Sequence, residues 1–180
     1  MESVGIMLGL APHTGIVFDK ICQLECIKPY ILVGGTALSL QIGNRQSEDL
    51  DFIKWRTSKS ENYACPRYSP LVQPVLIQDN LSAADLLSIG AMKMEVMMRR
   101  SKFRDYYDIY SLLQEGVDFH AMVDLALKYS GHLLHTKNLY AMLTNGARFS
   151  EDTNFTQLQP KYDITSKDIE DYLRRLILEA

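Results

Sequence analysis

The sequence predicts an α+β protein with a small β-sheet core in its N-terminal part and a C-terminal helical bundle. Two short apolar runs, at 30–33 and 50–55, have the length of strands and flank a glycine-containing turn. In the second half of the chain, apolar residues recur at helical spacing in several segments that end at glycines. We therefore expect an α/β core at 1–81 and a helical domain at 82–180.

Composition and charge restrict the class of protein. A chain of 180 residues can bury one sizeable core, and 47% hydrophobic with 23% charged residues is typical of a soluble globular protein. No apolar run approaches the roughly 20 residues that cross a bilayer, and the first ten residues contain Glu2 and no basic leader. We expect a cytoplasmic protein with no membrane partner. The net charge of −3 excludes a wholly basic nucleic-acid-binding surface.

The expected elements of the first half follow from apolar spacing and from proline and glycine. In order they are a helix within 13–28 that ends before Pro29, a buried strand at 30–33, a helix at 36–43 ended by Gly43, a strand at 50–55, a loop at 56–70, and a strand at 71–78. Pro74 places the last strand at an edge or a bulge, because proline cannot donate a ladder hydrogen bond.

Helices are expected through the second half of the chain. Ser82 and Asp85 resemble the start of a capping box, and Asp85 looks like the helix cap. The expected helices are 82–100, 103–115, 118–129, 133–144 and 162–178, the last capped by Thr165 and Asp168.

The most informative stretch joins a glycine turn to a pair of carboxylates. Gly34, Gly35 and Thr36 follow an apolar strand, which suits a turn where backbone N–H groups can approach a phosphate and where Thr36 could cap the helix. Asp49 and Asp51 are two residues apart, so on a strand they would share a face and could hold one metal ion. Each feature alone also occurs as a plain turn or a solvated strand end, but together they favour a nucleotide site.

A second cluster is cationic. Five basic residues fall within twelve positions: Lys93, Arg99, Arg100, Lys102 and Arg104. Local positive charge suits a nucleoside triphosphate and its metal. Lys93 lies in a methionine-rich helix, where a lysine can extend its ammonium group outward, and Arg100 projects from the same helix face.

Together these residues resemble the signature of polymerase-β-like nucleotidyltransferases, most closely that of the AbiEii/AbiGii-type toxin group. The resemblance covers roughly residues 31–113. The first block that matches in order is Gly34, Gly35, Thr36, Arg45, Ser47, Asp49 and Asp51, and the second is Lys93, Arg100, Lys102, Arg104, Asp105 and Asp108.

The resemblance implies a small mixed β-sheet of the nucleotidyltransferase type and a toxin that moves a nucleotidyl group from an NTP to a hydroxyl. The acceptor would be RNA, with tRNA the first candidate, or a protein, and a cognate antitoxin would be the partner. Mg²⁺ or Mn²⁺ would bind Asp49 and Asp51, which would act in catalysis with Lys93 and Asp105. The residues implied to bind nucleotide are Gly34, Gly35, Thr36, Arg45, Ser47, Lys93, Arg100 and Arg104.

The segment between Asp51 and Lys93 is short for this family, which usually has a third carboxylate on a later strand. Glu61, Asp79 and Asp85 are the acids in this segment, and none lies in a suitable apolar run. Three functions therefore stay open: an active nucleotidyltransferase, a catalytically reduced binding module of the same fold, and a hydrolase that uses the aspartates. The glycine turn disfavours the hydrolase.

Overall fold

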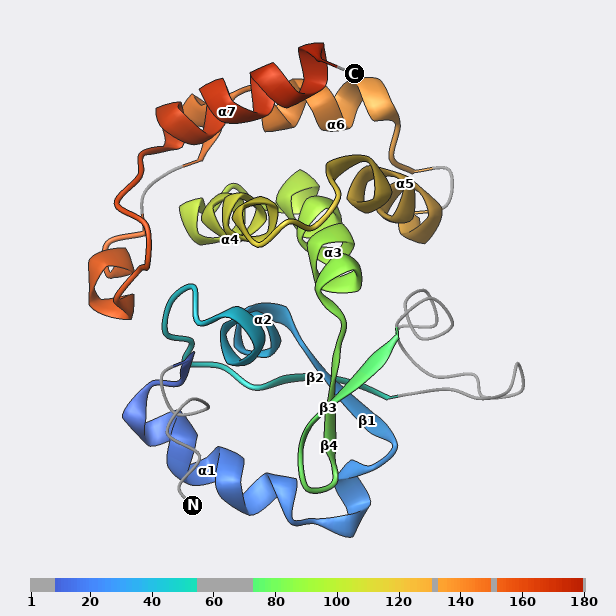
Figure 1. Cartoon of the computed structure of the whole chain (residues 1–180), viewed down its shortest axis with the longest axis vertical. Helices are drawn as coiled ribbons and strands as arrows, with labels where there is room; N and C mark the ends of the chain where they lie inside the picture. Colours follow the sequence, from blue (N-terminus) through green and yellow to red (C-terminus); the bar gives the residue numbers. More distant parts are fainter. Residues whose placement is uncertain (1–8, 55–72, 131–132, 150–151, 180) are drawn as a thin grey trace. The chain divides into compact units, whose positions relative to one another are not determined.

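The computed structural model describes residues 9–54, 73–130, 133–149 and 152–179 (Figure 1). The chain divides into two compact units, residues 1–89 and 90–180, and each is described by itself. The described residues form seven α-helices and a mixed four-stranded sheet, which confirms the expected α+β class. The functional division into 1–81 and 82–180 stays a prediction. No helix in these ranges has the length and apolar character needed to span a membrane.

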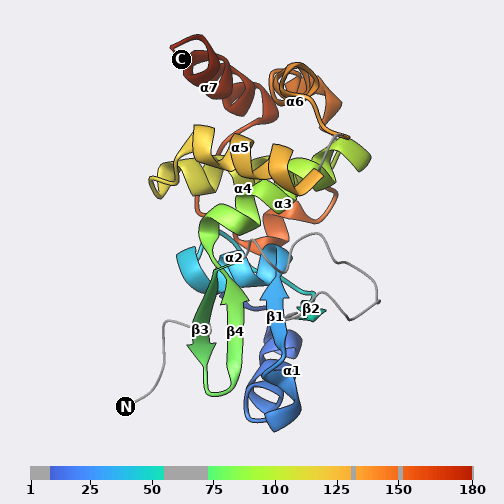
Figure 2. The ribbon, with the colours of Figure 1, turned by 90° about the vertical axis from the view of Figure 1, so that its right-hand side faces the viewer.

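The first unit is built on a sheet whose described strands have the order β2-β1-β4-β3 (Figure 2). Their bounds are β1 Tyr30–Val33, β2 Asp51–Lys54, β3 Pro74–Gln78 and β4 Leu81–Ala84. β1 is antiparallel to β2, with Val33 opposite Asp51, and parallel to β4. The edge position of β3 confirms the inference drawn from Pro74.

Two α-helices accompany this sheet in the described part of the unit, α1 (Pro12–Cys22) and α2 (Gly34–Ile42). A short 3₁₀ helix, η2, covers Glu25–Ile27. α2 starts directly after β1 and ends at Gly43, whose φ of +59° gives the left-handed cap expected of a glycine. Fully buried side chains of Leu32 and Leu38 connect the strand and the helix to one apolar core.

β4 corrects the expectation of a helix that starts at Ser82. The residues Leu81–Ala84 pair with β1 on one side and β3 on the other, so they form a central strand. A central strand is buried on both faces and shows no alternation, and three of its four residues are Ser or Ala. The expected cap at Asp85 is confirmed, because its carboxylate accepts hydrogen bonds from the Ser88 backbone N–H and hydroxyl.

The second unit is helical. Its elements are the part of α3 (Leu86–Arg99) from Gly90 on, α4 (Phe103–Gln114), α5 (Phe119–Ser130), α6 (Thr136–Leu143), η3 (Gly146–Arg148), η4 (Phe155–Leu158) and α7 (Ser166–Leu178). α6 and α7 start later than expected. The predicted capping box of Thr165 and Asp168 is confirmed.

Aromatic residues of α4 form the centre of this unit. Tyr106 and Tyr107 are fully buried, and the Tyr106 ring stacks on Phe149 with centroids 4.2 Å apart. The Tyr106 hydroxyl donates to the Leu143 carbonyl at 2.5 Å, so the buried polar atom is satisfied. α4 is therefore a well-fixed element, and it carries Asp105 and Asp108, the acidic residues of the second block.

Candidate active site

The turn between β1 and α2 brings a carboxylate against a glycine. Gly34 has a φ of +74°, a conformation that residues with a side chain rarely adopt. The register that sets Val33 opposite Asp51 also brings the Asp51 Oδ2 to 3.0 Å from where a Cβ on Gly34 would lie. The backbone conformation favours glycine here and a Cβ would also crowd the Asp51 carboxylate, so the turn and Asp51 lie together in the structure.

The next glycine contacts the loop that connects α2 to β2. A Cβ on Gly35 would lie 2.7 Å from Arg45 Nη2 and 3.1 Å from Ser47 Oγ. Arg45 and Ser47 are 4% and 6% exposed, and Arg45 Nη1 donates to the Gln46 carbonyl at 2.9 Å. These contacts support a role for Arg45 and Ser47 in steadying the turn, and their direct contact with a nucleotide stays a prediction.

The N-terminal segment holds the same loop from its backbone. The Ser47 N–H donates to the Gly9 carbonyl, and the Ala11 N–H donates to the Ser47 carbonyl, each at 3.0 Å. Thr14 Oγ1 donates to the Glu48 carbonyl at 2.7 Å. Residues that precede the motif in sequence therefore fix the backbone that leads to Asp49, which the motif alone did not reveal.

Thr36 links the start of α2 to the carboxylate segment. Its hydroxyl donates to the backbone carbonyl of Asp49, and its side chain is almost fully buried. The expectation that Thr36 caps the helix is wrong: the N-cap is Val33, without a side-chain bond, and Thr36 already lies in the first turn. The hydroxyl is used instead to hold Asp49, which lies just before β2.

Asp49 and Asp51 are both exposed, and neither forms an ion pair within the part of the chain that the structure describes. Both therefore have oxygen lone pairs available for an external cation. The glycine turn, Thr36, the Asp49 backbone and the Asp51 carboxylate meet at the C-terminal end of β1. The approach of Asp51 to the turn agrees with the sequence analysis, but β2 begins at Asp51 and Asp49 precedes it, so the expected placement of both carboxylates on one strand face stays a prediction.

Neither described acid between Asp51 and Lys93 adds a third carboxylate to this end of the sheet. Asp79 lies in the turn between β3 and β4, and because β4 runs parallel to β1, that turn is at the opposite end from Gly34. Asp85 follows β4 at the correct end, but its carboxylate already accepts from Gln73 N, Ser88 N and Ser88 Oγ. Glu61 lies outside the described residues. Within them, no group of three His, Cys, Asp or Glu could hold a metal.

In the second unit, Lys93 of α3 lies between two buried carboxylates of α4. Its Nζ is 2.8 Å from Asp105 Oδ1 and 2.7 Å from Asp108 Oδ2. The Lys93 side chain is 7% exposed, and both aspartate side chains are 0% exposed. The expectation that Lys93 extends outward is therefore wrong: its ammonium group turns inward because two carboxylates compensate the loss of water. Asp108 indeed orients a basic neighbour.

Arg100 adds a second cation to this cluster. Its Nε donates to Asp105 Oδ2 at 2.7 Å and its Nη2 to Asp105 Oδ1 at 3.0 Å, which is a bidentate pair. Burial raises the pKa of Asp105, but Lys93 and Arg100 outweigh burial and hold the pKa below its usual value of 3.8. Lys93, Arg100, Asp105 and Asp108, which we call the buried charge cluster, thus contain two positive and two negative groups.

Arg104 takes part in a different ion pair. The sequence placed Arg104 beside Asp105, but its Nε lies 3.2 Å from Asp152 Oδ2, and Lys102 Nζ lies 3.5 Å from Asp152 Oδ1. Asp152 is a residue that sequence reasoning missed, because no periodic pattern or motif surrounds it and its partners are about fifty positions away.

The family model for the nucleotidyl transferase AbiEii toxin, type IV toxin–antitoxin system, matches residues 18–64 and 60–175 of the chain. The matched ranges contain both residue blocks described above. No curated protein and no solved structure gives a significant match.

Proposed function

Because the chain belongs to the AbiEii family of nucleotidyl transferase toxins, we propose that it transfers a nucleotidyl group from an NTP to a hydroxyl with the help of Mg²⁺ or Mn²⁺. The acceptor is an RNA, with tRNA the first candidate, or a protein. The place of action is the cytoplasm, and a cognate antitoxin of the same type IV system is the partner.

One observation carries this proposal: the glycine turn and the two exposed carboxylates belong to one local structure. Asp51 lies against Gly34, and Thr36 holds the backbone of Asp49. The N-terminus of α2 starts at the same point, so its backbone N–H groups and its partial positive charge can bind phosphate oxygens. Phosphate-binding backbone next to metal-binding carboxylates suits a nucleoside triphosphate.

The donor set fits a hard divalent cation. Asp49 and Asp51 offer carboxylate oxygens, which Mg²⁺ and Mn²⁺ prefer, and the absent side chain of Gly34 leaves space for Asp51. When bound, the metal would neutralise phosphate charge and lower the pKa of the attacking hydroxyl. Asp49 and Asp51 would hold it, while Gly35 and Thr36 would keep the turn open to the phosphates.

The basic residues of the second unit differ in how accessible they are. Arg100 exposes 54% of its side chain and Arg104 exposes 30%, so both guanidinium groups are accessible to a ligand. Lys93 is confined between its two carboxylates. We propose that Arg100 and Arg104 contact the nucleotide and that Asp105, itself paired with Lys93, holds Arg100 in place. Direct participation of Lys93 and Asp105 in catalysis stays a prediction.

The decisive experiment is transfer of label from each of the four NTPs, with Mg²⁺ or Mn²⁺, to total RNA or protein. Asp49→Asn and Asp51→Asn should each abolish transfer, because the amide removes the charge that binds the metal. Asp79→Asn is the matched control: it makes the same change at the opposite end of the sheet and should leave transfer intact. Labelling that survives both site substitutions would overturn the proposed mechanism.

A catalytically reduced module that binds nucleotide without turnover is the second candidate. It is favoured by the absence of a third carboxylate from the described residues near Gly34 and by the pairing of Lys93 within the second unit. Metal-dependent NTP binding with no transfer to any acceptor, in a protein whose Asp51→Asn variant loses that binding, would identify this function.

A further inference from the structure

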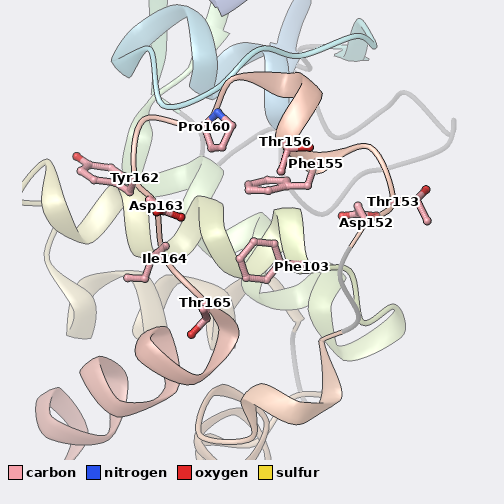
Figure 3. A pocket seen from close by; sticks show the side chains of 10 residues that line it. All are labelled: Phe103, Asp152, Thr153, Phe155, Thr156, Pro160, Tyr162, Asp163, Ile164 and Thr165. Carbon is pink, nitrogen blue, oxygen red and sulfur yellow. The ribbon is translucent and has the colours of Figure 1, made fainter.

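The second unit contains a pocket whose lining includes none of the residues proposed to bind the metal or the NTP. It has a volume of about 380 Å³, near the lower end of the roughly 300–1,000 Å³ found for small-ligand pockets (Figure 3). The lining comes from the start of α4 and from the segment that leads to α7. Its residues are Phe103, Asp152, Thr153, Phe155, Thr156, Pro160, Tyr162, Asp163, Ile164 and Thr165.

Aromatic rings give the pocket apolar walls. Phe103 and Phe155 meet edge to face, with centroids 4.9 Å apart and an interplanar angle of 83°. Tyr107 also packs on Phe155, with centroids again 4.9 Å apart, so the Phe155 ring is fixed by packing. Figure 3 shows the Phe103 and Phe155 rings between Asp163 on one side and Asp152 on the other. Phe103 and Phe155 are only 4% and 8% exposed, so they give a ligand a fixed apolar wall.

The two carboxylates of the pocket differ in exposure and in ion pairing. Asp152 has a side chain only 5% exposed, and it accepts from Arg104 and lies near Lys102. Asp163 is exposed and forms no ion pair with any residue that the structure describes. Asp163 is therefore the carboxylate that can accept N–H groups from a ligand, together with the exposed hydroxyl of Thr156.

Positive charge lies beside the pocket and not in its lining. Lys102 and Arg104 reach Asp152 from the start of α4, and the Lys102 side chain is 54% exposed. The partial positive charge at the N-terminus of α7 is met by Asp168, which closes the capping box with Thr165. A ligand with a neutral planar body and an attached phosphate would match this distribution better than a free cation or a triphosphate.

We propose that this pocket binds an unpaired nucleobase of a single-stranded RNA, with Asp163 reading its hydrogen-bonding edge and Lys102 meeting the adjoining phosphate. Single-stranded RNA is commonly bound by aromatic rings and by hydrogen bonds to base edges. A carboxylate accepts two N–H groups from guanine, one amino group from adenine or cytosine, and only the imino N–H of uracil. The expected order is therefore guanine first and uracil last. Only the choice of RNA as ligand rests on the proposed function.

The test is an NMR titration of the whole protein with GMP, AMP, CMP and UMP in the absence of divalent metal. GMP should shift the resonances of Phe103, Phe155 and Asp163, and should bind about tenfold more tightly than UMP, as expected for extra hydrogen bonds to a charged group. Asp163→Asn should remove this preference, while Asp124→Asn, an exposed substitution of the same kind on α5, should keep it. A titration with guanosine in place of GMP measures how much the phosphate, and its contact with Lys102, contributes to the binding affinity.

The binding of a nucleobase in this pocket can be disproved independently of the proposed transfer reaction. Asp51→Asn should leave GMP binding at the pocket unchanged, although it should abolish transfer. Equal binding of all four nucleotides, or a preference for GMP that survives Asp163→Asn, would overturn the proposal. So would shifts at these residues with Nα-acetyl-arginine amide but not with GMP, because they would assign the pocket to a basic side chain of a protein.

Discussion

Asp49 and Asp51 in the first unit are exposed carboxylates beside a glycine turn, whereas Asp105 and Asp108 in the second unit are completely buried around Lys93. The first pair faces solvent and can accept a cation. The second pair already has its cations, and its burial makes the ion pairs strong but costly to break. The same residue type thus provides an open binding site in one unit and a fixed, internally neutral framework in the other.

Because of this difference, substitutions at the two aspartate pairs should have different effects on ligand binding and on stability. Changes at an exposed pair should alter ligand binding with little effect on folding. Changes in the buried charge cluster should alter folding first, because any removed partner leaves a charge without water. Arg100 lies between these cases, since it is half-exposed yet bonded to a buried carboxylate.

The largest effect on stability is expected for Lys93→Met. The substitution leaves two buried carboxylates without their shared ammonium group, and loss of one partner of a buried pair costs about 3–5 kcal/mol. Urea unfolding followed by circular dichroism measures the change. Lys137→Met, at an exposed position of α6, is the control and should change the free energy of unfolding by less than about 0.5 kcal/mol. Equal stability of the two variants would contradict the buried cluster.

Gly34→Ala should destabilise the first unit by about 1–2 kcal/mol, because alanine is disfavoured at a positive φ and its Cβ would crowd Asp51. Gly15→Ala is the matched control, and it should change the free energy of unfolding in the opposite direction. Gly15 lies inside α1 with open space around it, so alanine should stabilise the protein by about 0.5–1 kcal/mol. If both substitutions had the same sign in urea unfolding, the turn geometry would be wrong.

Arg100→Ala should cost less than Lys93→Met, about 1 kcal/mol, because solvent screens a side chain that is half-exposed. If Arg100 contacts a phosphate, the substitution should reduce the free energy of NTP binding by more than it reduces the free energy of unfolding. Calorimetry of NTP binding, compared with urea unfolding of the same variant, separates the two effects. A variant that loses stability but keeps full NTP affinity would assign Arg100 to the framework alone.

The smallest effect is a pH dependence. The folded-state pKa of Asp105 lies below its usual 3.8, so the unfolded chain binds the proton more tightly than the folded protein. Asp105 therefore contributes stability that is complete above about pH 5 and is lost as the pH falls below 4 through the folded pKa. The urea midpoint measured from pH 7 to pH 3 should follow this course. A contribution that instead grew on acidification would contradict the ion pairs.

Local patterns predicted most of the backbone around the first candidate site, because its parts are close in sequence. Tyr30–Val33, the cap at Gly43, and the approach of Asp51 to the turn all follow from residues within about twenty positions of each other. The central strand Leu81–Ala84 was missed, because small residues buried on both faces carry no alternation that distinguishes a strand.

The second site was predicted less well because its partners lie on separate helices. The sequence identified Lys93, Arg100 and Asp105 but not which of them would pair, since pairing depends on how α3 and α4 pack. Asp105 forms ion pairs with Lys93 and Arg100 and not with its neighbour Arg104. Arg104 pairs instead with Asp152, which is 48 positions away. Such long-range choices are set by packing and not by periodicity.

We propose that Asp49 and Asp51 form a two-carboxylate metal site that only a bound nucleotide completes. Calorimetry of each NTP with and without Mg²⁺ tests it directly. With few anionic ligands to offset the dehydration of Mg²⁺, the protein alone should bind the metal weakly, whereas NTP binding should depend strongly on Mg²⁺ and be lost in Asp51→Asn. Tight Mg²⁺ binding by the nucleotide-free protein, or NTP binding that needs no metal, would contradict a metal site that the nucleotide completes.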